Sequence, residues 1–225
     1  MREIVLDTET TGLDPHSGHR IVEIGCVELV NHMPTGETYH QYINPERDVP
    51  EEAFRIHGLS ASFLKDFPVF GDVASSFSAF LGDAKLIIHN AAFDMGFINA
   101  EFSKVDVEPI DLDRATDTVA MARRKFPGAR ANLDALCQRF DIDNSNRELH
   151  GALLDARLLA DVYLELIGGR QPGLILKEDK QKTGVESESS ARPYREPRPH
   201  TASDEELVAH KAFVDQLEDA IWTVE

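Results

Sequence analysis

Three short segments of the sequence combine acidic side chains with small residues or a histidine. The first contains Asp7 and Glu9, at the end of an apolar run over residues 3–8 that predicts a buried strand. Because side chains two positions apart on a strand lie on one face, these carboxylates should be close together. Two such charges repel each other unless a cation lies between them. An ordinary acidic loop explains this segment, taken alone, equally well.

The second and third segments lie at predicted helix starts. Asp94 follows an apolar run and begins a predicted helix, where an acid often only compensates the helix dipole. His150 and Asp155 are five residues apart, so on one helix they would point about 140° away from each other. Both reach one site only if His150 precedes the helix and Asp155 lies about one turn into it. Gly151 is compatible with a helix that begins after His150.

The chemistry of the combined set is that of a metal-dependent phosphodiesterase. Carboxylates are hard oxygen ligands, which suit Mg²⁺ or Mn²⁺ and suit zinc poorly. Two such ions about 4 Å apart can activate a water and stabilise the leaving oxygen of an in-line displacement. His150 is a natural general base, because an unperturbed histidine titrates near about pH 6.5. The set therefore predicts two-metal hydrolysis of phosphodiester bonds in nucleic acid.

The elements that must position these residues follow from hydrophobic periodicity. Strands are predicted over residues 3–8, 20–30, 36–43 and 85–89, and helices over 72–81, 93–102, 116–125, 133–140 and 152–167. Early strands joined by a short turn favour an antiparallel pair. The strand–helix alternation that follows predicts an α/β domain with a mixed sheet, ending near residue 170.

Composition limits the classes of protein and partner. The net charge of −17 argues against a tight DNA-binding protein acting alone. It is compatible with a metal-dependent nuclease held on its substrate by a partner, since carboxylate-bound cations can meet phosphate. Cys26 and Cys137 are predicted to be buried, reduced thiols. No run approaches the roughly 20 apolar residues of a membrane span, and the first residues lack a signal-peptide pattern, so we expect a cytoplasmic protein.

The last part of the sequence predicts a linker and a helix. Residues 177–202 contain no Leu, Ile or Phe and predict a flexible, disordered linker. Ser203 to Glu206 fit a capping box, and apolar residues follow at helical spacing. A lone helix of this size is marginal in water, so its apolar face should dock on the chain's own domain or on another protein. The long linker favours another protein.

Several motifs resemble those of a known enzyme family. Asp-Thr-Glu-Thr-Thr-Gly (7–12), His-Asn-Ala-Ala-Phe-Asp (89–94) and His-Gly-Ala-Leu-Leu-Asp-Ala (150–156) resemble the three motifs of the DEDDh 3′→5′ exonucleases. The resemblance covers about residues 2–170. Phe-Arg-Ile-His-Gly (54–58) and Ile-Asp-Asn-Ser (142–145) are similar to segments of the epsilon, or proofreading, subunits of bacterial DNA polymerase III. The resemblance implies a ribonuclease-H-like fold, with a mixed five-stranded sheet flanked by helices.

The same resemblance implies residue roles. Two Mg²⁺ or Mn²⁺ ions would be held by Asp7, Glu9, Asp94 and Asp155, with Asp7 bridging them and His150 as the base. The residues beside the nucleotide at the DNA 3′ end would be Asp7, Glu9, Glu52, His57 and Asp155. His89 would either touch substrate or pack at the strand end.

The resemblance also implies partners and domain limits. Residues 1–170 would form the exonuclease domain, residues 177–202 the linker, and residues 203–225 a tail helix that binds the polymerase alpha subunit. Within residues 171–176, Gln171, Leu174 and Leu176 resemble a short motif that binds the sliding clamp. A final edge of the domain core explains these three residues equally well.

The predicted function is therefore proofreading. A 3′→5′ DNA exonuclease of this kind releases nucleoside 5′-monophosphates for the replicative polymerase. One alternative is an RNA-trimming exoribonuclease of the same family, against which the polymerase-type tail argues. The other alternative is a non-catalytic subunit that stabilises a polymerase assembly, and the intact set of acids and histidine argues against it.

Overall fold

The computed structural model describes residues 1–145, 147, 149–168 and 201–216. The chain divides into two units, Met1–Ile175 and Leu176–Glu225, and each is treated by itself below. Among the described residues, no helix is both long enough and apolar enough to cross a membrane.

A five-stranded mixed sheet forms the centre of the first unit, in the order β3-β2-β1-β4-β5. The strands β1 (Arg2–Thr10), β2 (Ile21–Val30) and β3 (Met33–Tyr42) form the antiparallel part. On the other side of β1, the strands β4 (Lys85–Ile88) and β5 (Ala115–Asp117) run parallel to it. The predicted antiparallel pair and the mixed sheet are both confirmed.

Strand β5 corrects the predicted helix over residues 116–125. Ala115–Asp117 pairs with Leu86, Ile87 and Ile88, and the helix α5 (Thr118–Lys125) begins only after it. Asp117 caps α5, since its side chain accepts a hydrogen bond from the N–H of Val119. Pairing with β4 in the tertiary structure overrides the local helical pattern of these residues.

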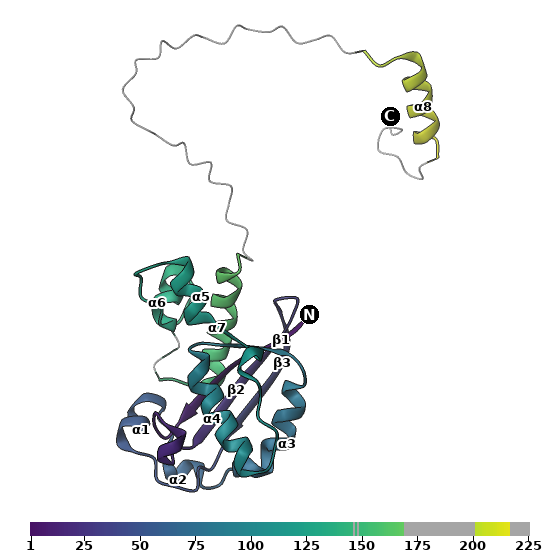
Figure 1. The fold of residues 1–225 in the computed structure, drawn as a ribbon. Helices are drawn as coiled ribbons and strands as arrows, with labels where there is room; N and C mark the ends of the chain where they lie inside the picture. Colours follow the sequence, from purple (N-terminus) through teal and green to yellow (C-terminus); the bar gives the residue numbers. More distant parts are fainter. Residues whose placement is uncertain (146, 148, 169–200, 217–225) are drawn as a thin grey trace, which may run out of the picture. The chain divides into compact units, whose positions relative to one another are not determined.

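Helices cover both faces of the sheet (Figure 1). The side chains of Ile4 and Leu6 in β1 pack in one core with α3 (Phe70–Leu81) and α4 (Ala91–Lys104). The side chain of Val5, between them, packs in a second core with α6 (Leu133–Phe140) and α7 (Ala152–Leu166). Alternate β1 side chains therefore face opposite helical layers, which decides where the acids of this strand point.

Short elements that periodicity cannot reveal complete this unit. They are the turns η1 (Pro15–Ser17) and η2 (Leu112–Arg114) and the helices α1 (Glu51–His57) and α2 (Ala61–Leu64). Gly58 caps the C-terminal end of α1: it has a positive φ of 73° and donates its N–H to the carbonyl of Phe54. Cys26 and Cys137 are buried free thiols, as predicted.

The second unit contains helix α8 (Asp204–Val214). The predicted capping box is confirmed, because the N–H of Glu206 lies 3.3 Å from Ser203 Oγ and the N–H of Ser203 lies 2.8 Å from Glu206 Oε2. Leu207, Val208 and Phe213 of α8 are exposed. The predicted clamp segment 171–176, residues 177–200 of the predicted linker and residues 217–225 of the tail lie outside the described residues.

Candidate active site

The end of β1 places acids on one face of the sheet and an anchoring threonine on the other. Asp7 and Glu9 point to the α7 side, whereas Thr8 between them points to α4. Asp94 lies in the first turn of α4, as predicted, and its Oδ1 accepts hydrogen bonds from the Thr8 N–H at 3.1 Å and Oγ1 at 2.7 Å. The strand therefore presents two carboxylates itself and fixes the orientation of a third.

Gly25 brings the start of α7 to the same place. It pairs with Asp7 across β1 and β2, and a Cβ atom at residue 25 would lie only 2.2 Å from the backbone of Ala152 and Leu153. Only a glycine permits this close approach. Helix α7 can therefore start directly over the sheet, with Asp155 in its first turn and facing the β1 acids.

His150 lies outside α7, as the five-residue spacing predicted. The helix begins at Ala152 with Gly151 as its N-cap. The backbone N–H of His150 donates to the carbonyl of Ile56 at 3.0 Å, which ties this loop to α1. Its ring Nδ1 lies 3.2 Å from Asp155 Oδ2. Histidine and aspartate therefore reach one site from opposite sides of the helix start.

The electrostatics show how strongly the carboxylates are crowded. Burial, followed by the charges of Asp94, Glu9 and Asp155, holds the pKa of Asp7 well above its usual value. Burial and the Asp155 charge raise the pKa of Glu9 to about 8. Burial raises the pKa of Asp94 to about 7, although the Thr8 hydrogen bonds oppose that shift. A divalent cation would relieve this repulsion.

Asp155 is the exception, and the cause is a residue that the sequence did not reveal. Burial alone would raise the pKa of Asp155, but its contacts with Arg147 and His150 hold it below its usual value. Arg147 was not among the predicted site residues. The available signal was an arginine just before His150 in a segment otherwise rich in Asp and Glu.

The donor set fits a divalent cation. Glu9, His150 and Asp155 each offer one ligand atom, and these atoms lie within 4.8 Å of one another. Asp7 and Asp94 add two further carboxylates: the charges of Asp94 and Glu9 help to raise the pKa of Asp7, and the charge of Asp94 helps to raise that of Glu9. Oxygen-rich sites of this kind suit Mg²⁺ or Mn²⁺.

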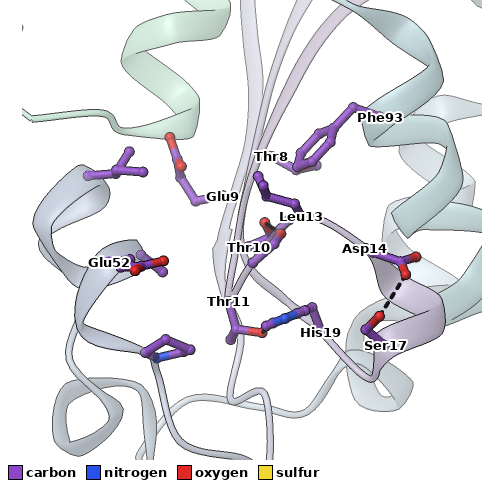
Figure 2. A pocket seen from close by; sticks show the side chains of 14 residues that line it. Thr8, Glu9, Thr10, Thr11, Leu13, Asp14, Ser17, His19, Glu52 and Phe93 are labelled. Carbon is purple, nitrogen blue, oxygen red and sulfur yellow. Dashed lines mark hydrogen bonds between the residues drawn. The ribbon is translucent and has the colours of Figure 1, made fainter.

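A hollow of about 470 Å³ adjoins the acids. Figure 2 shows Glu9, Glu52 of α1, Leu13 of the β1–β2 loop and Phe93 of α4 around it. Ile56 of α1 adds another apolar side chain to the lining. The hollow thus combines apolar walls with acidic groups beside the proposed metal ligands.

Two predicted histidines occupy different environments from His150. His57 is only 5% exposed, and its Nδ1 accepts the N–H of Leu59 at 3.0 Å. Burial lowers its pKa. His89 lies at the end of β4, where its Nδ1 is 2.9 Å from Thr118 Oγ1, and burial lowers its pKa too. This contact supports the packing alternative for His89.

Comparison with known proteins gives the family. Residues 4–163 match the family model described as Exonuclease. The DNA polymerase III subunit epsilon of Rickettsia conorii is 51% identical over 225 residues, which cover 96% of each chain. That of Escherichia coli is 45% identical over 227 residues, covering 96% of this chain and 93% of the relative. The chain belongs to the epsilon-subunit family of exonucleases.

Solved structures agree on the fold of this epsilon-family exonuclease. The nuclease domain of 3′hExo, a DEDDh family member bound to rAMP, has a TM-score of 0.65 at 17% identity, over 75% of this chain and 92% of that one. Exonuclease X in complex with 5′ overhanging duplex DNA has a TM-score of 0.59 at 23% identity, with the same coverage. The predicted resemblance and the ribonuclease-H-like fold are confirmed. Exonucleases of this family generally use divalent metal ions.

Proposed function

We propose that the chain is the proofreading 3′→5′ exodeoxyribonuclease of a cytoplasmic replicative DNA polymerase. It releases nucleoside 5′-monophosphates from DNA 3′ ends by hydrolysis with two Mg²⁺ or Mn²⁺ ions. The observation that carries this proposal is the convergence of the β1, α4 and α7 acids beside His150. The family assignment supports exonuclease chemistry at this cluster of acids.

The proposed roles follow from position and charge. Asp7, Glu9, Asp94 and Asp155 hold the ions, which when bound supply the positive charge that activates a water and stabilises the leaving 3′ oxygen. His150 accepts the proton of that water. The His150 ring lies at the acids, with its Nδ1 3.2 Å from Asp155 Oδ2 and 2.9 Å from Arg147 Nη2.

The hollow beside Glu9 is the proposed place of the terminal nucleotide. Leu13, Ile56 and Phe93 offer apolar contacts to a base, and Glu52 offers a carboxylate that can accept a hydrogen bond. His57 is the buried last residue of α1, so its proposed part is to support this wall. A frayed or single-stranded 3′ end enters such a hollow without the cost of unpairing, and this favours mispaired ends.

The partner proposals concern the rest of the chain. In this proposal residues 1–170 form the exonuclease domain, residues 177–202 the linker and residues 203–225 the segment that binds the polymerase alpha subunit. Support comes from the exposed apolar side chains of α8 and from relatives named as subunits of DNA polymerase III. Residues 171–176, with Gln171, Leu174 and Leu176, are proposed to bind the sliding clamp.

Matched oligonucleotides test the function. The purified chain is incubated with Mg²⁺ and either DNA or RNA of one sequence, the DNA ending in a paired or a mispaired 3′ nucleotide. We expect nucleoside 5′-monophosphates, released fastest from the mispaired DNA. A clear preference for RNA would favour the RNA-trimming alternative. A folded protein that cleaves neither substrate would favour the non-catalytic alternative.

A further inference from the structure

Arg147 directs its guanidinium group into the acidic site. Its Nε lies 2.6 Å from Asp155 Oδ1 and its Nη2 lies 2.7 Å from Asp155 Oδ2, so both oxygens of this carboxylate are engaged. The third nitrogen, Nη1, lies 2.6 Å from Oδ1 of Asp134 on α6. The Arg147 side chain is only 7% exposed. Bidentate pairs of this geometry are among the stronger contacts between side chains.

The same guanidinium also engages His150. Nη2 of Arg147 lies 2.9 Å from His150 Nδ1. A guanidinium can only donate hydrogen bonds, so Nδ1 must be the acceptor and carry no proton. Arg147 therefore forms hydrogen bonds with both Asp155, the proposed metal ligand on α7, and a ring lone pair of His150, the proposed base.

A divalent ion needs those same lone pairs. Glu9, His150 and Asp155 each offer a ligand atom within 4.8 Å of the other two. Two of these residues, His150 and Asp155, already form hydrogen bonds with Arg147. A guanidinium and a divalent ion both carry positive charge, and they repel each other at this range. They cannot share the two oxygens of Asp155 in this arrangement.

We propose that Arg147 is an internal counter-cation of the active site, which competes with the divalent ion for Asp155. The inference rests on the metal ligands assigned under the proposed function. Metal binding moves the guanidinium off Asp155, and Asp134, which is 54% exposed, stays available as its acceptor. The His150 backbone remains tied to Ile56 meanwhile, so the side chain of Arg147 can move without releasing the loop.

The competition has a direct consequence for affinity. Each metal-binding event must break the charge-assisted contacts between Arg147 and Asp155. Removing the guanidinium removes that cost, so the divalent ion should bind more tightly. If Arg147 were purely structural and only tied the loop to α7, its removal would have the opposite effect. His150 and Asp155 would become disordered, and the divalent ion would bind more weakly.

Calorimetric titration of the full chain with Mn²⁺ distinguishes the two roles. Arg147→Met should bind Mn²⁺ about tenfold to a hundredfold more tightly than the wild type, from the typical strength of hydrogen bonds to charged groups. Arg147→Lys keeps the charge but loses the bidentate contact with Asp155, so its Mn²⁺ affinity should lie between those of the wild type and Arg147→Met. Arg130→Met removes an exposed arginine from the loop before α6 and should leave the affinity unchanged.

Thermal unfolding gives an independent measurement. In EDTA, Arg147→Met should melt below the wild type, because it loses the cation that compensates the crowded acids. Mn²⁺ should then raise its Tm by more than it raises that of the wild type. Unchanged or weaker Mn²⁺ binding by both Arg147 variants overturns the inference while leaving the proposed function intact. A wild-type chain that binds no Mn²⁺ overturns both.

Discussion

Thr8 donates two hydrogen bonds to one oxygen of Asp94, from its backbone N–H at 3.1 Å and from its hydroxyl at 2.7 Å. Both residues are buried. Thr8 lies between the two acids of β1 but points to the opposite face of the sheet. The strand that presents Asp7 and Glu9 thus also orients the carboxylate that α4 contributes.

Thr8→Val tests this coupling, because valine keeps the shape of the side chain and the backbone hydrogen bond. The lost hydroxyl contact should lower kcat/KM about tenfold, the value expected for one hydrogen bond to a charged group. It should also raise the pKa of Asp94 above about 7. The measurement is Mg²⁺-dependent cleavage against pH. Thr35→Val, at an exposed position of β3, is the matched control, and equal losses in both variants would contradict the assignment.

His150→Ala should lower cleavage by about a hundredfold to ten-thousandfold, the usual contribution of a general base. Asp7→Ala should abolish nearly all cleavage, since it removes a proposed ligand from the centre of the site. Rates on single-stranded DNA, with circular dichroism to check the fold, measure both effects. Full activity in either folded variant would show that the residue has no such role.

Gly25→Ala should damage stability and activity together. The added Cβ would lie 2.2 Å from the backbone at Ala152 and Leu153, so α7 must shift away from the sheet. Overpacking of this kind costs about 1–3 kcal/mol, and the shift also displaces Asp155. Denaturant unfolding and cleavage rate measure the two effects. Gly96→Ala, where an added Cβ meets no heavy atom within 4 Å, is the matched control and should not be destabilised.

The raised pKa of Glu9, about 8 against an ordinary 4.5, predicts a pH-dependent stability. The folded chain holds this proton where the unfolded chain has lost it. Stability from this group is therefore complete below about pH 4.5 and is lost as the pH rises through about 8. Glu9→Gln mimics the protonated form and isolates the effect from other titrating groups.

Thermal unfolding in EDTA should give similar Tm values for wild type and Glu9→Gln near pH 4.5, and a higher Tm for the variant above pH 8. In Mn²⁺ the order at high pH should reverse, since the charged carboxylate binds the ion more strongly than the neutral amide of Gln. A Tm difference that does not change with pH in EDTA would contradict the raised pKa.

Deleting residues 203–225 should leave cleavage of short DNA unchanged, because every proposed catalytic residue lies in the first unit. It should abolish copurification with the polymerase alpha subunit, since α8 and its exposed Leu207, Val208 and Phe213 are removed. Cleavage assays and affinity copurification measure the two properties. Normal copurification of the truncated chain would refute the proposed tether.

The sequence by itself determined the local features of this protein. The five-residue spacing of His150 and Asp155 required a helix that begins between them, and α7 does begin there. The placement of Asp94 in a first helical turn and the capping box of Ser203 were equally local. Such features depend on backbone geometry over a few residues, which hydrophobic periodicity and capping preferences describe well.

The tertiary structure alone decided the contacts between distant segments. It gave the strand at Ala115–Asp117 its partner in β4, and it brought Thr8 to Asp94 across 86 residues. It also brought the Arg147 guanidinium into ion pairs with Asp155 and Asp134. Each of these depends on how separate helices and strands pack around one core, and on the charge balance that packing creates. No pattern along the chain encodes that balance, because the interacting groups become neighbours only in the folded protein.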